Sequence, residues 1–475
     1  MFSNDDNLSL LLLTALAALG GASILLCSWR RFELAITLIL ISPWMGWLLS
    51  SNVAMSVEEE SATGTASYIR ILLVLLVGCC GMLQFLRSWF TEQAKCFPRY
   101  LMFFALFIVY AILSTGYSLD RKFTLIRSFE FLIFFIFLLG FHFWLNSRQK
   151  LDTTLNIYYG VIVIGMILSA IALVLMPERV WDWKRPDRFQ GLADHPNTFG
   201  ALCMLAYPIL AWKYTTSRNR AKSVSVILIC VTAGLHVLSG SRSSLLAAVI
   251  GGIVWLSLSV KSITLKRIAI GLAFGLTLTF SVSFLILTKP TSLQRGDSNI
   301  TALTGRTDFW KGCVLLIKEK PVQGYGFGVA GKVWEDPRFY KEGQALWAGS
   351  AKSSLHNGYL SLAIGLGVVG LGVWLVFVSI PTWQVMSLKS SPYKAFILAM
   401  IFQLLILNFA ESALATGSQI LTSLVFWLTL VIAGRLSNLL TPKIEYASKT
   451  YEETNFGLIN STGNLAGLCA GHPSA

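Results

Sequence analysis

Long apolar runs constrain this chain more than any other feature. A helix needs about 20 mostly apolar residues to cross a bilayer, and on that criterion the sequence contains about thirteen such runs. Inside lipid each segment must satisfy its own backbone polar groups, which favours helices. We therefore predict an all-α integral membrane protein with about 12 to 13 transmembrane helices. The predicted spans are 8 to 28, 32 to 50, 69 to 87, 100 to 116, 123 to 145, 155 to 176, 197 to 213, 222 to 239, 243 to 260, 267 to 288, 356 to 380, 393 to 411 and 419 to 436.

The composition agrees with this class and excludes others. Hydrophobic residues make up 55% of the 475 residues and charged residues only 13%, which is not typical of a soluble domain. The net charge is +14, yet no basic run interleaved with aromatic residues lies outside the apolar segments, so we expect no nucleic-acid partner. The eight cysteines show neither a C-x-x-C pair nor ligand spacing, so neither disulfides nor a metal site is predicted.

Orientation follows from the lysines and arginines of the short connections, because cytoplasmic loops carry the positive excess. The first apolar run lacks the positive flank of a cleaved signal peptide and is expected to remain as a helix. The intervening loops include an acidic one, so the N-terminus is expected outside and the C-terminus inside. The basic residues that occupy every second connection are Arg30, Arg31, Arg87, Lys95, Arg99, Arg148, Lys150, Lys213, Arg218, Arg220, Lys222, Lys261, Lys266, Arg267, Lys389, Lys394, Arg435 and Lys443.

The chain divides into a predicted transmembrane domain, residues 1–436, and a polar tail, residues 437–475, expected to be a disordered cytoplasmic extension. One long polar interruption, residues 289–355, is predicted to form a large loop on the outer side. Within it, Thr307 to Lys320 has apolar residues at helical spacing. We expect that helix to lie along the membrane surface.

Four positions hold charge on the predicted outer side, where insertion does not require it. They are Arg188, Arg242, Arg306 and His356. An arginine near the bilayer can grip phosphate oxygens with two parallel hydrogen bonds, although any single one is explained equally by an interfacial anchor. Because the bias of insertion opposes positive charge on this side, the group favours an anionic ligand such as a lipid phosphate.

His356 begins an apolar run and can accept a proton from a hydroxyl near neutral pH. The competing interpretation is a hydrogen-bonded structural histidine. Arg127 and Glu130, three residues apart on one helix, are predicted to pair. Glu411 ends the run at 393 to 411 on the predicted outer side. We expect it to line the cavity that holds the other outer-side charges, with interfacial solvation as the alternative.

Two glycine patterns in the loop do not indicate nucleotide binding. Gly326, Gly328 and Gly331 have the spacing of a dinucleotide-binding turn, and Val333 stands where a P-loop needs Ser or Thr. Both motifs require a preceding strand and a following helix. We expect the glycines to permit a sharp turn near the membrane surface.

Several motifs together resemble the O-antigen ligase and polymerase superfamily, most closely its exopolysaccharide polymerases. The similarity runs from about Arg188 to Gly370, and the combination of motifs in this order is more specific than any one of them. The motifs are Ser-Gly-Ser-Arg-Ser-Ser-Leu-Leu-Ala from Ser239, Gly-Arg-Thr-Asp-Phe-Trp from Gly305, Pro-Val-Gln-Gly-Tyr-Gly-Phe-Gly from Pro321, His-Asn-Gly-Tyr-Leu from His356 and Gly-Leu-Gly-Val-Val-Gly from Gly365.

The resemblance implies a glycosyltransferase of the bacterial inner membrane that polymerises surface polysaccharide at the periplasmic face. Its donor would be a glycan on undecaprenyl diphosphate, its acceptor a glycan or lipid, and polysaccharide export machinery a possible partner; no cofactor or metal is implied. Arg242 and Arg306 match the arginines that hold the diphosphate, Arg188 matches more loosely, and His356 matches the catalytic base. Single displacement would invert the anomeric centre.

Other functions remain open from the sequence. An O-antigen ligase that acts on lipid A core, or a protein O-glycosyltransferase, would carry the same groups. A flippase or exporter of lipid-linked sugars would also need cationic groups, but distributed through the membrane depth and accessible from both sides. The predicted clustering on the outer side favours the enzyme.

Overall fold

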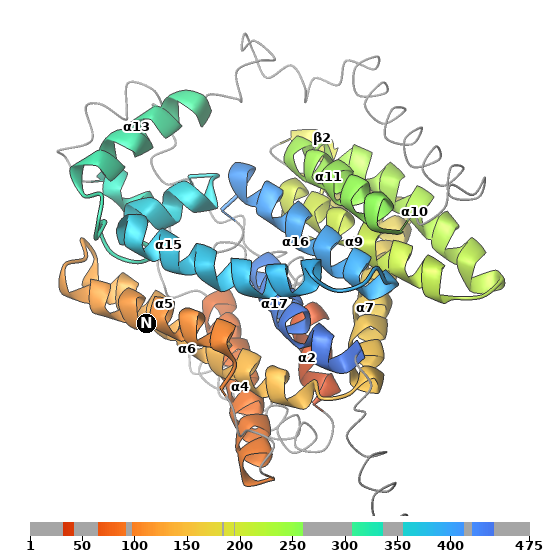
Figure 1. Cartoon of the computed structure of the whole chain (residues 1–475). Helices are drawn as coiled ribbons and strands as arrows, with labels where there is room; N and C mark the ends of the chain where they lie inside the picture. The colour runs from red at the N-terminus through yellow and green to blue at the C-terminus, as the bar shows by residue number, and fades with distance from the viewer. Residues whose placement is uncertain are drawn as a thin grey trace, which may run out of the picture.

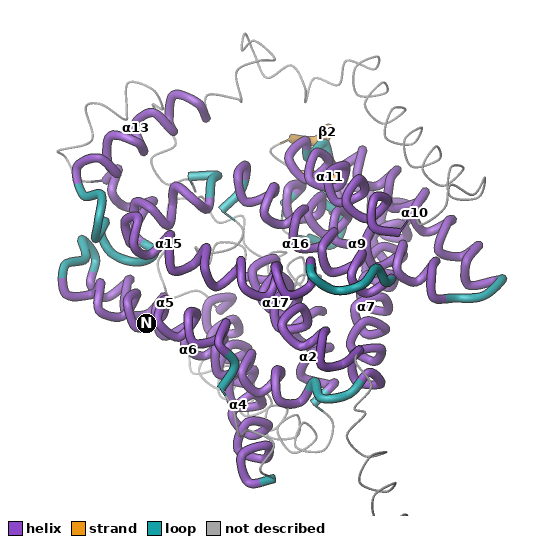
Figure 2. The backbone as a smooth tube through the Cα atoms, viewed as in Figure 1, coloured by secondary structure: helices purple, strands orange, loops and turns teal. Residues whose placement is uncertain are grey.

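The protein is a bundle of long helices, seen in a computed structural model (Figures 1 and 2). The structure describes residues 32–41, 65–91, 97–182, 185–193, 195–259, 306–335, 355–412 and 420–440. Its α-helices are α2 (Glu33–Ile41), α4 (Thr65–Phe90), α5 (Arg99–Leu113), α6 (Arg121–Trp144), α7 (Arg148–Leu175), α8 (Pro177–Val180), α9 (Pro196–Thr216), α10 (Arg220–Ser239), α11 (Arg242–Ser259), α13 (Arg306–Glu319), α15 (Gly358–Met386), α16 (Pro392–Ala410) and α17 (Ile420–Leu440). Two 3-10 helices, η2 (Ser114–Gly116) and η3 (Val329–Glu335), and two short antiparallel strands, β1 (Trp181–Asp182) and β2 (Arg185–Phe189), complete the described elements.

The predicted fold class is confirmed. Eight helices of the described part are long and apolar enough to cross a membrane. The predicted spans at 8 to 28 and 267 to 288 lie outside the described residues. Helix α17 ends at Leu440, so the predicted domain boundary at 436 falls inside its last turns, and the rest of the predicted tail also lies outside the described residues.

Helix starts follow from local sequence. Asp120 accepts a hydrogen bond from the Phe123 amide (2.9 Å) at the start of α6, and Ser147 accepts one from the Lys150 amide at the start of α7. Such side chains satisfy amides that the first helical turn leaves unpaired. Ser391 acts in the same way before α16, whose first residue is a proline, the position where proline costs least.

Helix α15 corresponds to the span predicted at 356 to 380 and continues to Met386. It is interrupted at Gly367, whose φ of 65° is left-handed. The apolar pattern hides this break because every residue around it is apolar or glycine. The result is a short arm, residues 358–366, that carries the residues after His356, and a longer arm, residues 368–386, that crosses the bundle (Figure 1).

The glycine-rich turn 321–328 packs into this interruption. The amides of Tyr325 and Gly326 donate to the carbonyls of Ile364 (2.9 Å) and Gly365 (2.8 Å). The Val368 amide donates to the Pro321 carbonyl (2.8 Å). Broken helices are tolerated within a membrane protein where neighbouring segments satisfy the freed backbone groups. The turn was predicted from its glycines, and its partner in the structure is the break in α15.

Phe327 anchors the same turn in the main core. Phe327 is 2% exposed, and its ring is nearly perpendicular to the rings of Phe107 (5.7 Å between centroids) and Phe131 (4.8 Å). The Phe327 amide donates to Ser114 Oγ (3.0 Å), and Thr124 Oγ1 donates to its carbonyl (2.9 Å). Edge-to-face aromatic contacts of this kind add to the burial of the rings. The turn is therefore fixed to α5 and α6 as well as to α15.

Helix α13, whose position along the membrane surface stays a prediction, has apolar contacts within the protein. Its apolar stripe packs on the protein: Cys313 is fully buried and Leu316 is 3% exposed, in a cluster with Tyr325 and Ile364. Burial raises the pKa of the Cys313 thiol to about 12. The stripe has a partner inside the molecule because the glycine-rich turn and the short arm of α15 together form an apolar surface for it.

Two ion pairs lie near the start of α6. The predicted pair of Arg127 and Glu130 is confirmed, with 2.9 Å between Nη1 and Oε2. Lys332 of η3 lies 2.6 Å from Asp120 Oδ2. The hydrogen bond from Lys332 lowers the pKa of Asp120 most, and the hydrogen bond from the Phe123 amide lowers it further. Both bonds favour the charged carboxylate.

Candidate functional site

Helix ends that are distant in sequence meet at one end of the bundle. We call this the site end; it comprises the start of α9, the turn between α10 and α11, the start of α15 and the end of α16. In Figure 1 the upper end of α16 lies between α15 and the α10–α11 pair. Arg242, His356 and Glu411 come from these ends, and hydrogen bonds connect His356 and Glu411 to the start of α9.

His356 and Glu411 form the centre of the site. His356 Nδ1 lies 3.0 Å from Glu411 Oε2, although 55 residues separate them. The Glu411 side chain is 5% exposed, whereas that of His356 is 29% exposed. A carboxylate beside Nδ1 favours the tautomer with hydrogen on that nitrogen, which leaves Nε2 as a proton acceptor. The pair therefore has the form of a general base oriented by a buried carboxylate.

The backbone fixes where His356 stands. Its φ of 48° is left-handed, an unusual conformation for a residue other than glycine. Asn357 caps α15 directly afterwards, since its Oδ1 accepts from the amides of Tyr359 and Leu360 (3.0 Å each). The Asn357 amide in turn donates to Ser412 Oγ (3.2 Å). The two residues before α15 thus contact the two residues after α16, which holds His356 against Glu411.

Arg242 stands exposed in a tight turn at the site end. Helix α10 ends at Ser239, Gly240 follows with a φ of 60°, and α11 begins at Arg242 itself. Below the turn, the buried His236 ring lies within hydrogen-bond distance of Ser244 Oγ (2.7 Å), and Ser244 Oγ donates to the Ser241 carbonyl (3.0 Å). These hydrogen bonds fix the backbone of the turn from which the Arg242 side chain extends.

Arg188, for which diphosphate binding was predicted, has a buried side chain. It is only 4% exposed and lies under Gly240. Its Nε donates to the Ser239 carbonyl (2.9 Å) and its Nη2 to Asn197 Oδ1 (2.7 Å). The Arg188 guanidinium therefore has two hydrogen-bond partners inside the protein.

Arg306 is the first residue of α13, and its side chain lies outside what the structure describes. One turn further along, Trp310 Nε1 donates to the Leu355 carbonyl (3.3 Å). Leu355 directly precedes His356. The start of α13 therefore approaches the start of α15, which brings the backbone of Arg306 to the same end of the bundle.

Sequence reasoning missed the role of Asn197 and did not assign one to Glu411. Asn197 Nδ2 donates to Glu411 Oε1 (2.9 Å), so both carboxylate oxygens have partners. The available signals were an acidic residue at the end of an apolar run, which is rare without a function, and an asparagine beside Pro196 at a helix start. Neither signal names the partner.

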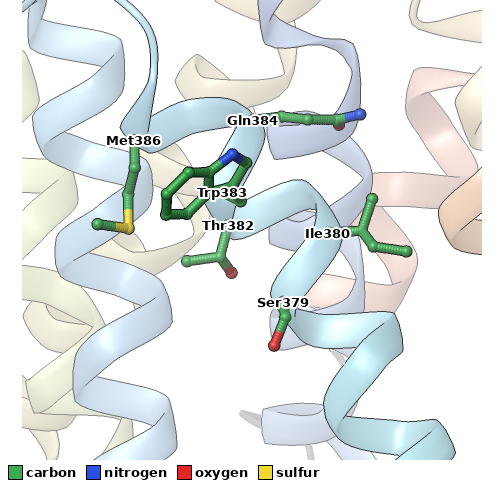
Figure 3. Close-up of a pocket in the computed structure, with 6 residues that line it drawn as sticks. All are labelled: Ser379, Ile380, Thr382, Trp383, Gln384 and Met386. Atoms are coloured by element: carbon green, nitrogen blue, oxygen red, sulfur yellow. The ribbon is translucent and has the colours of Figure 1, made fainter.

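A separate hollow of about 550 Å³ is lined by the last turns of α15 (Figure 3). It lies at the far end of this helix from His356 and contains no titratable group, so we do not place the chemistry there. The lining residues are Ser379, Ile380, Thr382, Trp383, Gln384 and Met386.

Comparison with known proteins supports the motif resemblance. Residues 224–375 match the family model described as O-antigen ligase. No curated protein matches the chain. The match covers the α10–α11 turn, α13 and His356, and identifies this part of the chain as an O-antigen ligase family domain. The protein is accordingly a multi-pass membrane enzyme of the glycosyltransferase class. The family comprises O-antigen ligases and polysaccharide polymerases and implies lipid-linked glycan substrates.

Proposed function

We propose that this protein polymerises a surface polysaccharide at the periplasmic face of the bacterial inner membrane. It transfers a glycan from undecaprenyl diphosphate to a sugar hydroxyl, with inversion and without a metal ion. The observation that carries the proposal is the His356–Glu411 pair, which lies at the same end of the bundle as the exposed Arg242. A base and a phosphate ligand are the two groups that such a transfer requires.

The reaction is a single displacement. His356 Nε2 takes the proton of the acceptor hydroxyl as its oxygen bonds to the anomeric carbon, and the bond from that carbon to the diphosphate oxygen breaks with its electron pair. Arg242 and Arg306 stabilise the charge that develops on the leaving diphosphate. The products are the extended glycan, undecaprenyl diphosphate and a protonated histidine, whose charge Glu411 stabilises.

Topology supports a periplasmic site. The helix ends opposite the site end carry Lys213, Arg218, Arg220 and Lys222 in the connection from α9 to α10. Positive connections of this length face the cytoplasm. The site end then faces the periplasm. A transfer from a lipid-linked donor suits this compartment, because nucleotide sugars are held in the cytoplasm.

The assignment as a polymerase rests on the motif resemblance, and gene deletion separates it from its alternatives. Loss of a polymerase leaves single repeat units on the lipid carrier and on the cell surface. Loss of an O-antigen ligase leaves long lipid-linked chains and unmodified lipid A core, and loss of a protein glycosyltransferase leaves unmodified surface proteins. A deletion that traps lipid-linked units on the cytoplasmic side would instead indicate a flippase.

Point variants test the mechanism with donor extracted from the deletion strain. We expect His356→Ala to bind undecaprenyl diphosphate normally and to lose roughly a hundredfold or more in turnover, the scale of general-base removal. Arg242→Ala should weaken both binding and turnover. The matched control is Arg220→Ala, because Arg220 is likewise an exposed first residue of a spanning helix but lies at the other end of the bundle.

Near-normal turnover in His356→Ala would remove the base assignment. Equal effects of Arg242→Ala and Arg220→Ala would remove the diphosphate assignment. A parallel assay with EDTA tests the metal-free mechanism, since loss of activity that a divalent ion restores would contradict it.

A further inference from the structure

A continuous series of hydrogen bonds joins the turn of Arg242 to the proposed base. It begins at the Ser239 carbonyl, which accepts from Arg188 Nε (2.9 Å), and continues from Arg188 Nη2 to Asn197 Oδ1 (2.7 Å). Asn197 Nδ2 then donates to Glu411 Oε1 (2.9 Å), and Glu411 Oε2 faces His356 Nδ1 (3.0 Å). The series connects α10, β2, α9, α16 and the start of α15.

The polarity of the groups along the series is consistent. The Asn197 amide accepts from a cation through its oxygen and donates to a carboxylate through its nitrogen, so its orientation is determined by both neighbours. Replacing either neighbour leaves one end of the partly buried Asn197 amide unpaired, which is costly. Bonds to charged partners are also the stronger ones. The arrangement therefore holds Glu411 in one position rather than in several.

Burial separates Arg188 from the exposed arginine. Arg188 is 4% exposed, and two nitrogens of its guanidinium bond a backbone carbonyl and the Asn197 side chain. Gly240, the residue above it, would place a Cβ 3.2 Å from Arg188 Nε. The guanidinium thus packs directly beneath the turn that presents Arg242.

We infer that Arg188 and Asn197 are positioning residues that hold the Arg242 turn and His356 in one hydrogen-bonded frame, and that Arg188 is not a ligand of the diphosphate. The inference rests on the proposed function, in which Arg242 grips the leaving group and His356 activates the acceptor. The two groups must act on opposite sides of one anomeric carbon. Their spacing is set by residues that touch neither substrate.

Two binding and turnover measurements distinguish positioning from ligation. Arg188→Leu should leave the Kd for undecaprenyl diphosphate, measured in nanodiscs, within about twofold, while turnover falls about 10- to 100-fold, the usual effect of removing a supporting partner of a catalytic group. Arg188→Lys should restore turnover in part, because an ammonium reaches only one of the two acceptors in the guanidinium geometry. The matched control is Arg179→Leu, an exposed arginine in the same outer segment.

A double-mutant cycle tests whether the residues act in series. If Asn197 works through Glu411, then Asn197→Leu should lower turnover in the natural protein and lower it little further in Glu411→Gln. A general loss of folded protein would instead add to the Glu411→Gln effect. Turnover is normalised to the number of undecaprenyl diphosphate sites, which counts folded protein in each variant.

Failure of the positioning role and failure of the proposed function give different results in these assays. If His356→Ala and Arg242→Ala behave as expected but Arg188→Leu weakens undecaprenyl diphosphate as much as Arg242→Ala does, Arg188 is a diphosphate ligand and the inference is wrong. Additive effects of Asn197→Leu and Glu411→Gln would also overturn it. Normal turnover in His356→Ala would show that the proposed function fails first.

Discussion

Replacing Gly367 by alanine should damage the site, although this residue lies inside an apolar helix. Gly367 has a φ of 65°, and a Cβ there would overlap the backbone of Val322 and the Pro321 carbonyl. With its ψ of −170°, Gly367 lies in a region that is essentially restricted to glycine, and holding another residue there costs about 1–3 kcal/mol. The overlap is with backbone, which cannot rotate away as a side chain does.

The structural consequence reaches His356. Relief of the overlap requires the two segments to separate by roughly 1 Å before ordinary contact distances return. Forced insertion of an extra carbon into a packed region costs about 1–3 kcal/mol, so we expect a total destabilisation of about 2–6 kcal/mol. The separation would also stretch the bonds from Tyr325 and Gly326 to the short arm. Misplacement of a catalytic group by about 1 Å can lower the rate about 100-fold.

Gly372→Ala provides the matched control in the long arm of the same helix. A Cβ at Gly372 meets nothing within 4 Å, and alanine is favoured over glycine in a helix by about 0.5–1 kcal/mol. Thermal unfolding of both purified variants, followed by tryptophan fluorescence, and turnover with extracted donor measure the two effects. If Gly367→Ala melts and reacts like Gly372→Ala, the packing of the glycine-rich turn into α15 does not support the site.

Two further predictions concern charge and topology. The pKa of Asp120 is lowered by its hydrogen bond to Lys332 and, next in size, by that from the Phe123 amide. The charged Asp120 carboxylate therefore stabilises the folded state fully above its pKa in the unfolded chain, about 3.9. This stabilisation is lost as the pH falls through the lower pKa of the folded state. The difference in Tm between the natural protein and Asp120→Asn should therefore be largest near neutral pH and disappear in acid, and a difference independent of pH would contradict this. A reporter fused after Gly331 should be periplasmic and one fused after Arg220 cytoplasmic; the opposite result would place the site on the wrong face for the proposed reaction.

The sequence determined the elements of this protein because each depends on local chemistry. Apolar runs of spanning length produce helices wherever the backbone must satisfy itself. Asp120, Ser147 and Ser391 cap helices with their own following amides, and the Arg127–Glu130 pair follows from a spacing of one helical turn. The glycine-rich turn was also expected from its composition.

Tertiary structure decided what those elements meet. The break at Gly367 is invisible in an apolar run, because the groups that stabilise it come from residues 321–326. The apolar stripe of α13 indicated amphipathic burial but could not distinguish a membrane surface from a protein surface. Only packing showed that it faces the protein.

The site shows the same division. Residue type and position marked His356 and Arg242 as candidates, since a histidine and an exposed arginine carry recognisable chemistry by themselves. Glu411 and Asn197 acquire theirs from hydrogen bonds across 55 and 214 residues of chain. Arg188 has the same guanidinium as Arg242, and only its burial beneath Gly240 separates the two proposed roles. Hydrogen bonds between residues so far apart in the sequence depend on how the helices pack. No local sequence pattern predicts that packing.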